Sequence, residues 1–299
     1  MKTATTTATV AAQFRNILFP TDFSPASAQA IPYIKRIANQ YEASVTALHV
    51  RPPIVNPMTA PGTWPAEIEA AKVVDEKRRK EILGAFSGIR TELLVGEGSI
   101  QSCLNEAIKK SSADLVVIGT RGRTGLGKLL LGSVAEEIFR TVPCPVLTVG
   151  PHCDPSHEAP GQLREILYAT DLSPESQSAA AYAVSLAQEF QAHLVLLHVI
   201  PNLETYDLVS AADVTTSSEK LLHKIVPQQA GALCKTECFV EGGDPAQKIL
   251  EFARMRETDL IVLGVSPEEG VPGAATHLPM ATAHKIVSHA TCPVLTVLH

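Results

Sequence analysis

The segment from Gly119 to Ser133 has the composition of a phosphate-binding loop. It places five glycines and three positively charged residues within fifteen positions. Glycines let a backbone approach a ligand closely, and cationic side chains offset phosphate charge. Part of it has the spacing of a P-loop, but Leu129 stands where that loop needs a Ser or Thr to hold Mg²⁺. Gly132 also interrupts the helix that should follow Lys128, so the P-loop interpretation is rejected.

A second spacing fits the segment better: Gly119 and Gly122 with two residues between them, then nine residues before Gly132 and Ser133. Gly119 ends an apolar strand, where a missing side chain lets a ligand approach, and Gly122 permits a left-handed turn. Gly132 and Ser133 open the next helix, whose free N–H groups and dipole favour an anion. The cationic residues of the intervening loop are Arg121, Arg123 and Lys128. The pattern therefore predicts an anion site.

Ser133, the cationic side chains of the loop and Asp22 near the first strand also have explanations that need no ligand. Ser133 and Glu136 form a capping box, which would explain Ser133 alone but not the glycine spacing. Asp22 is a common type of turn residue before Ser24 and Pro25. The cationic side chains could simply be solvated, as many surface charges are. The sequence leaves these alternatives open for the individual residues.

The elements that must position this segment recur in two halves of the chain. Four blocks repeat in the same order with offsets of 149, 149, 145 and 148 residues. The matched blocks begin at Asn16 and Glu165, Ala47 and Leu196, Asp114 and Asp259, and Pro143 and Thr291. A domain-sized period indicates tandem duplication rather than a solenoid. We predict domains at 14–151 and 163–299, joined by a Pro- and Gly-containing linker at 152–162.

Within the first half, short apolar runs alternate with longer amphipathic stretches. The predicted strands are Ile17–Phe19, Val45–Val50, Thr91–Val95, Leu115–Ile118 and Val146–Val149. The predicted helices are Pro25–Tyr41, Trp64–Phe86, Ser99–Lys110 and Ser133–Arg140. Apolar strands without polar alternation are typical of parallel sheets covered on both faces. The fold class predicted is therefore α/β: two tandem five-stranded parallel sheets with helices on both faces, Rossmann-like, with a ligand site at the carboxyl ends of the strands.

The glycine spacing, the Pro20-Thr21-Asp22 motif, the strand ending at Val50 and the repeated final strands together resemble the universal stress protein family. The resemblance covers about residues 14–150 and 163–299, and it implies the adenine-nucleotide alpha-hydrolase-like fold and ATP as the ligand, with Mg²⁺ as a companion. Carried over residue by residue, it implies nucleotide contacts at Asp22, Val50, Ile118, Gly119, Arg121, Gly122, Arg123, Gly132, Ser133 and Val134. Asp22 and Val50 would face the adenine and ribose, and Gly132, Ser133 and Val134 would receive the phosphates.

The second half has lost most of this pattern. It keeps Gly264, but Ser266 and Pro267 replace Arg121 and Gly122 of the first half. Glu268 and Glu269 follow directly, and negative charge beside a triphosphate weakens binding. We expect no ATP binding of the family type there. Drift after duplication and a pocket for a different ligand remain alternatives.

Composition limits the class of protein. A formal charge of −6 argues against a general nucleic-acid binder, and 45% hydrophobic residues are ample for packed cores. We expect no membrane segment, no secretory signal and reduced cysteines, and therefore a cytoplasmic protein. No residue set matches a standard metal site.

These observations favour an ATP-binding stress or regulatory protein, with a slow ATPase or phosphotransferase and a ligand-free scaffold as alternatives. Near the predicted phosphates the sequence offers no obvious acidic metal ligand apart from Glu136, and phosphoryl transfer needs a positioned metal. The apolar final strands would be exposed edges, which invite pairing, and the resemblance implies that the two halves meet through them as an intrachain pseudo-dimer. A homodimer of chains is a further expectation that no particular residue supports.

Overall fold

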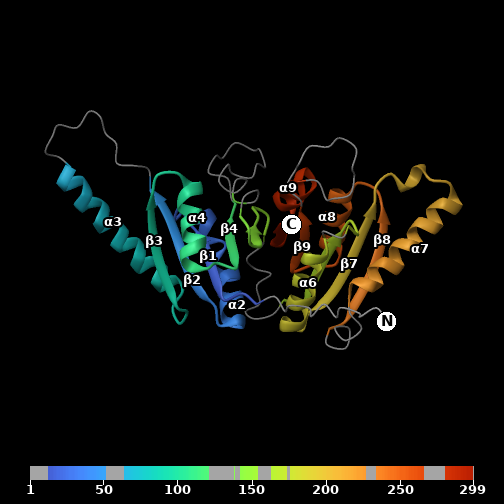
Figure 1. The fold of residues 1–299 in the computed structure, drawn as a ribbon, viewed down its shortest axis with the longest axis horizontal. Helices are drawn as coiled ribbons and strands as arrows, with labels where there is room; N and C mark the ends of the chain where they lie inside the picture. The colour runs from blue at the N-terminus through green and yellow to red at the C-terminus, as the bar shows by residue number, and fades with distance from the viewer. Residues whose placement is uncertain are drawn as a thin grey trace, which may run out of the picture. The chain divides into compact units, whose positions relative to one another are not determined.

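The structure is a computed structural model that describes residues 13–51, 64–120, 138, 142–153, 163–173, 176–226, 234–265 and 280–298; side chains of 64–71, 177 and 280 are outside the description. The chain divides into two compact units, formed mainly by Phe14–Gly161 and Gln162–Ile286. Each unit is an α/β body, as predicted (Figure 1).

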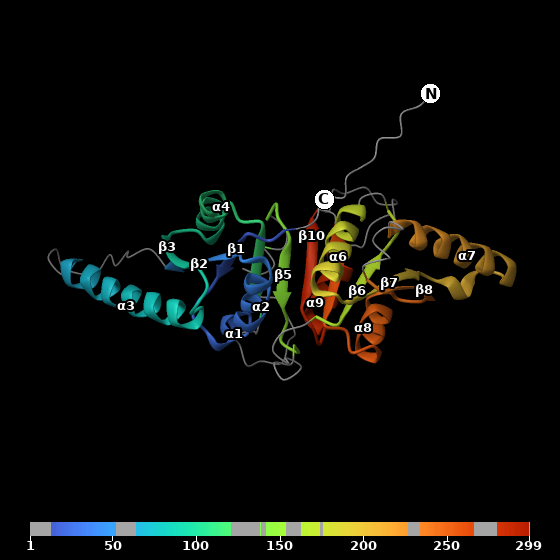
Figure 2. The same ribbon diagram turned by 90° about the horizontal axis from the view of Figure 1, so that it is seen from below.

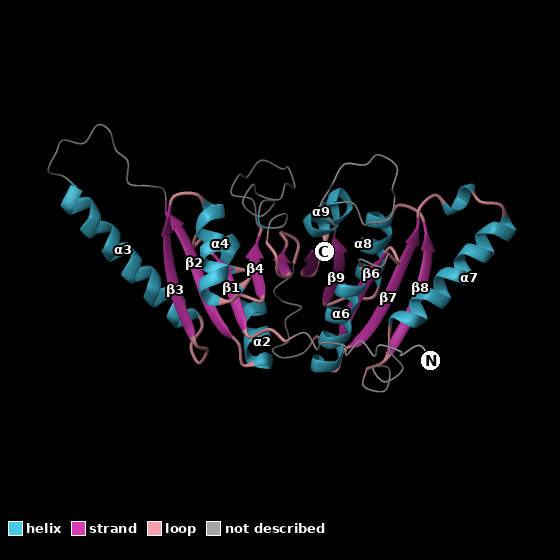
Figure 3. Ribbon diagram, in the orientation of Figure 1, coloured by secondary structure: helices cyan, strands magenta, loops and turns pink. Residues whose placement is uncertain are grey.

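The first half alternates strands and helices from β1 to β4 (Figure 3). Its elements are β1 (Asn16–Pro20), α1 (Pro25–Ala28), α2 (Ile31–Tyr41), β2 (Ser44–Arg51), α3 (Trp64–Ala85), β3 (Thr91–Glu97), α4 (Ile100–Ser111), β4 (Leu115–Gly119) and β5 (Val146–Val149). All five predicted strands are present, with ends within two residues of the prediction. The predicted helix at Ser133–Arg140 lies almost wholly outside the described residues, although Ile138 is helical.

The predicted helix Pro25–Tyr41 is wrong in one respect, because the chain forms two helices there. Pro32 lies in the first turn of α2, and proline has no N–H to donate to the preceding turn. The backbone therefore breaks at Gln29 and Ala30, and Ile34 restarts the helical bonding by donating its N–H to the Ala30 carbonyl at 3.0 Å. The result is a short α1 that lies close to the end of β4.

The strands of the first half form a parallel sheet in the order β3-β2-β1-β4-β5. The order reverses direction between β1 and β4, which is the switch point where α/β sheets bind ligands. Figure 2 shows α2 and α3 on one face of this sheet and α4 on the other. The strands are almost fully buried, with no exposure at Ile17, Leu18, Phe19 and Val117. Helices on both faces thus explain why these strands lack polar alternation.

The second half repeats this order as β8-β7-β6-β9-β10, again with parallel pairs throughout. Its elements are β6 (Glu165–Thr170), α6 (Gln177–Phe190), β7 (His193–Ile200), η2 (Leu203–Thr205), α7 (Leu208–Ile225), β8 (Thr236–Gly242), α8 (Pro245–Met255), β9 (Leu260–Val265), α9 (Met280–His289) and β10 (Val294–Leu298). Within the described ranges no helix combines the length and apolarity needed to cross a membrane. All six cysteines are free thiols.

Candidate functional site

The carboxyl end of β1 runs into a tight turn that carries Asp22. Phe23 has a left-handed backbone with φ 59°, and its N–H donates to Thr21 Oγ1 at 3.0 Å. The N–H of Ser24 donates to Asp22 Oδ1 at 2.9 Å, and Ser24 in turn caps α1 by accepting from Ser27 N–H at 3.2 Å. Asp22 therefore has the turn-forming role that the sequence allowed. Its exposed side chain also lies at the edge where a ligand was predicted.

The turn after β1 is fastened to the end of β2. Thr21 N–H donates to the Leu48 carbonyl at 2.8 Å, and His49 Nδ1–H donates to the Thr21 carbonyl at 2.9 Å. His49 is 7% exposed and is therefore a core histidine. The next residue, Val50, points to the opposite face of the sheet, because side chains alternate along a strand. Its Cγ2 lies 3.8 Å from the position that a Cβ on Gly96 would take.

Gly119 at the end of β4 is glycine for a reason that the sequence did not indicate. A Cβ built on it would lie 2.4 Å from the Ala26 carbonyl oxygen and 3.1 Å from Ser27 Cα, both in the backbone of α1. Packing against α1 therefore requires the missing side chain, whatever a ligand does. Ile118, one residue earlier, is buried and 3% exposed.

The described members of the predicted site follow three neighbouring strands. Asp22 follows β1, Val50 lies near the end of β2, and Ile118 and Gly119 close β4. Because β1 pairs in parallel with both β2 and β4, these ends lie side by side at one edge of the sheet. The other predicted contacts lie outside the described residues: Arg121, Gly122, Arg123, Gly132, Ser133 and Val134.

The second half reproduces the turn but not its surroundings. Leu172 is left-handed with φ 65°, its N–H donates to Thr170 Oγ1 at 3.0 Å, and Ser173 N–H donates to Asp171 Oδ1 at 3.0 Å. Asp171 Oδ2 is buried and has no hydrogen-bond partner among the described atoms. Burial lowers the pKa of His198, although its bond to the Thr170 carbonyl and the charge of Asp171 oppose this. The turn is thus an architectural unit common to both repeats.

Comparison with known proteins decides the classification. The sequence profile described as the universal stress protein family matches residues 13–150 and again residues 162–297. Together the two matches cover most of the chain. The chain belongs to the universal stress protein family. The tandem arrangement inferred from the repeats is thereby that of two universal stress protein units in one chain.

Relatives of this universal stress protein share either one unit or the whole chain. A universal stress protein of Methanocaldococcus jannaschii is 34% identical over 46% of this chain and 82% of its own length. One from Mycolicibacterium smegmatis is 26% identical over 94% of this chain and 96% of its own. The crystal structure of a universal stress protein from Archaeoglobus fulgidus has a TM-score of 0.68 at 20% identity, covering 95% of this chain and 98% of that one. The last likeness supports the fold.

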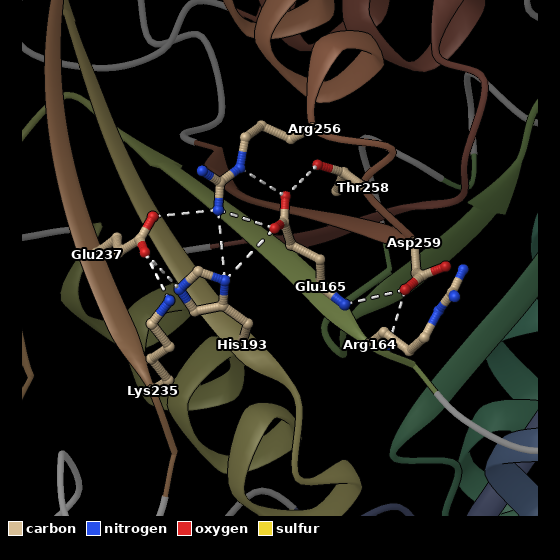
Figure 4. Close-up of polar contacts among 8 residues, drawn as sticks. All are labelled: Arg164, Glu165, His193, Lys235, Glu237, Arg256, Thr258 and Asp259. Atoms are coloured by element: carbon tan, nitrogen blue, oxygen red, sulfur yellow. Dashed lines mark hydrogen bonds and ion pairs between the residues drawn. The ribbon is translucent and has the colours of Figure 1, made fainter.

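The second universal stress protein unit carries a charged network at the opposite, amino-terminal edge of its sheet (Figure 4). Arg256 binds Glu165 through two bonds, Nε to Oε1 at 3.2 Å and Nη2 to Oε2 at 2.9 Å, and also reaches Glu237 at 3.2 Å. These bonds, first of all that to Glu165, raise the pKa of Arg256. His193 Nδ1 lies 3.3 Å from the guanidinium. Thr258 donates to Glu165 Oε1 at 3.4 Å.

Sequence reasoning missed this network and one further cluster, in which Arg78 of α3 reaches the turn after β1. The signal for the network was present in the repeat. Glu165 and His193 pair at the positions where the first unit has Asn16 and Ser44, so two ionisable residues replace two neutral ones. No comparable signal pointed to Arg78, since it lies in a helix rich in charged residues.

Proposed function

We propose that the first unit of this universal stress protein binds an adenine nucleotide, ATP, in a stress or regulatory role. The observation that carries the proposal is the meeting of the ends of β1, β2 and β4 at the switch point of the first sheet, with exposed Asp22 among them. The glycine-rich segment with Arg121, Gly122 and Arg123 begins directly after β4. A loop of this composition at that edge is suited to a phosphate chain.

The proposed contacts divide between the two ends of the nucleotide. Asp22 and Val50 would face the adenine and ribose, and Ile118 and Gly119 would support the start of the loop. Gly132, Ser133 and Val134 would bind the phosphates through N–H groups and a hydroxyl.

We propose binding rather than efficient turnover. The segment from Gly119 to Val134 contains no acidic residue, and Glu136 and Glu137 are the first ones after it, whereas phosphoryl transfer needs a metal and a residue that orients the nucleophile. Mg²⁺ would accompany the nucleotide as its usual counterion. In the second unit Glu268 and Glu269 would oppose phosphates, so we propose no ATP there.

The test is titration calorimetry of the full chain with ATP, with matched carboxylate variants. Asp22→Asn should weaken ATP binding on the order of tenfold, because a charged hydrogen-bond acceptor contributes about 1.5 kcal/mol or more. Asp171→Asn changes the equivalent residue of the second unit and should leave the affinity unchanged. Equal effects of the two variants, or no binding by the wild-type chain, would refute the proposal.

A second pair of measurements separates the alternative functions. Mass spectrometry of the freshly purified chain should identify a bound adenine nucleotide, and the double variant Gly132→Val, Ser133→Val should lose it. Phosphate release at one turnover per minute or faster that the same variant abolishes would favour an ATPase. A chain that carries and binds no nucleotide would favour a scaffold. A solved universal stress protein is a complex with cAMP, so cAMP belongs in the ligand panel.

We also propose domain bounds of 14–151 and 163–299 with a linker at 152–162, and pairing of the two domains through their final strands. The support is that both final strands, β5 and β10, are apolar, and unpaired apolar edges are unfavourable in solution. An experimental solution structure with these strands far apart would rule the pairing out.

A further inference from the structure

Helix α3 contributes a cation to the carboxyl edge of the first sheet. The Arg78 guanidinium lies over the Phe23 ring, 4.9 Å from its centroid, and Nη1 donates to His49 Nε2 in a short hydrogen bond. Phe23 and His49 also contact each other edge to face, with centroids 5.0 Å apart. Arg78 therefore joins one residue that follows β1 to one residue at the end of β2.

These two partners of Arg78 flank the turn that carries Asp22. His49 Nδ1–H is bonded to the carbonyl of Thr21, the residue before Asp22, and Phe23 is the residue after it. Because Nδ1 donates, Nε2 is an acceptor, which is the tautomer that a guanidinium N–H requires. The left-handed backbone of Phe23 is unfavourable for a bulky residue, so the contacts of its ring stabilise the turn conformation.

A second contact orients α3 at this edge. Asp75, one turn before Arg78 on the same face of the helix, accepts from Arg51 Nη1 at 2.9 Å. Arg51 Nη2 also lies 3.8 Å from Glu97 at the end of β3. Arg51 is two residues after His49, so its side chain projects from the same face of β2. The helix is thus held by β2 at two points, but only Arg78 reaches the Asp22 turn.

The second unit keeps the turn, but its described residues place no cation beside it. Leu172 replaces Phe23, which removes the aromatic ring, and His198 keeps the equivalent bond to the Thr170 carbonyl. Within the described part of this unit no arginine or lysine bonds His198. The cation is therefore a property of the unit that keeps the glycine-rich segment.

We infer that Arg78 is a positioning residue for the nucleoside end of the nucleotide in the first unit. The inference rests on the proposed ATP binding and adds to it a residue outside the predicted contact set. Arg78 acts through the Phe23 ring and His49, which fix the turn on both sides of Asp22. Replacing Arg78 leaves the Asp22 side chain unchanged but loosens the backbone that positions it. The loss should therefore fall on the nucleoside contacts and not on the phosphate contacts.

The experiment compares Arg78→Met with Arg79→Met in the full chain. Arg79 is adjacent on α3, 49% exposed, and its ion pair with Glu76 at 3.7 Å lies within the helix, so this variant removes the same charge without touching the turn. Arg78→Met should weaken ATP and adenosine binding equally, on the order of tenfold, from the loss of a cation–π contact and one hydrogen bond. Arg79→Met should remain within about twofold of the wild type.

A double-mutant cycle with Asp22→Asn supplies the decisive readout. If Arg78 acts through the Asp22 turn, Arg78→Met should weaken binding by less than threefold once Asp22 is already Asn. Arg78→Lys keeps a cation over the ring and a donor to His49, so it should recover most of the affinity. If Arg78→Met does not fold, Arg78→Lys takes its place in the test, with an expected threefold loss of affinity.

Four results would overturn the inference. Additive effects of Arg78→Met and Asp22→Asn would show that the two residues act independently. A larger loss for ATP than for adenosine would mean that Arg78 interacts with phosphates directly. Equal affinities of the Arg78 and Arg79 variants would leave the proposed function standing and remove the role of Arg78, whereas no binding by the wild-type chain would remove both.

Discussion

The replacement Gly119→Ala tests whether the end of β4 is shaped by packing or by a ligand. The added Cβ would lie 2.4 Å from the Ala26 carbonyl oxygen, where a carbon and an oxygen normally stay about 3.3 Å apart. Backbone must therefore move by roughly 0.9 Å. The clash involves backbone atoms of α1, so no side-chain rotation can relieve it. The backbone of α1 is itself fixed by the Ser24 cap and by a 2.9 Å bond between Thr21 and Ser27.

The size of the effect follows from this rigidity. Overpacking a closely packed interior costs about 1–3 kcal/mol, and a clash with backbone belongs at the upper end, so we expect about 3 kcal/mol. That corresponds to a fall in the Tm of the first unit of roughly 6–12 °C for a body of this size. The matched control is Gly84→Ala in α3, where a Cβ meets nothing within 4 Å. This variant should stabilise the helix by about 0.5–1 kcal/mol.

The assay is scanning calorimetry of the full chain without nucleotide, resolved into the transitions of the two units, with urea unfolding as a second measure. The decisive comparison is the nucleotide-free Tm of Gly119→Ala against those of the wild type and Gly84→Ala. An unchanged Tm combined with weaker ATP binding would refute the packing explanation. Gly119 would then be glycine because a ligand approaches its backbone.

Three further predictions concern charged and titratable groups. Arg256→Met should destabilise the second unit by about 2 kcal/mol in urea unfolding, between the values for exposed and buried pairs, because Glu165 loses both its bonds to the guanidinium; Lys248→Met in α8, the helix that ends just before Arg256, removes an exposed pair and should cost less than about 0.5 kcal/mol. Burial holds the pKa of His198 below its usual value, so on acidification the unfolded chain takes up a proton before the folded chain does. The free energy of unfolding should therefore fall as the pH drops below about 6.5. In His198→Gln the difference in this free energy between about pH 7.5 and pH 5.5 should be smaller than in the wild type. Burial, first of all, raises the pKa of Cys144 to about 12, so iodoacetamide at about pH 8 should alkylate it far more slowly than a free thiol in a peptide, and rapid labelling of the folded chain would contradict this.

The strands and the parallel sheet could be predicted because their sequence signals are local and repeated. Runs such as Leu115–Ile118 are apolar at every position, and only strands covered on both faces bury such runs. The duplication gave each assignment a second example, so Asp22 and Asp171 could be placed in equivalent turns from the amino-acid sequence alone. The fold class followed from the alternation of these elements.

The contacts that involve side chains distant in sequence could not be predicted in this way. Nothing local distinguishes Arg78 from its charged neighbours in α3, since its role depends on a histidine 29 residues away. Gly119 was predicted as a ligand contact, and its packing against α1 was not foreseen because it depends on a helix whose length is set by Pro32. Helix ends were also hidden, because left-handed residues at them, such as Glu42 and Gln191, are not glycine.

The Asp114 carboxylate has a consequence for synthesis on the ribosome. It accepts the N–H groups of Arg15 and Asn16 at 2.8 and 3.0 Å, across 99 and 98 residues, and so joins the start of β4 to the start of β1. The central strand β1 is the first strand of this sheet to leave the ribosome. Its second neighbour, β4, is synthesised about a hundred residues later. Once β5 has emerged, every parallel pairing of the first sheet can be completed from residues already translated, before the second repeat exists.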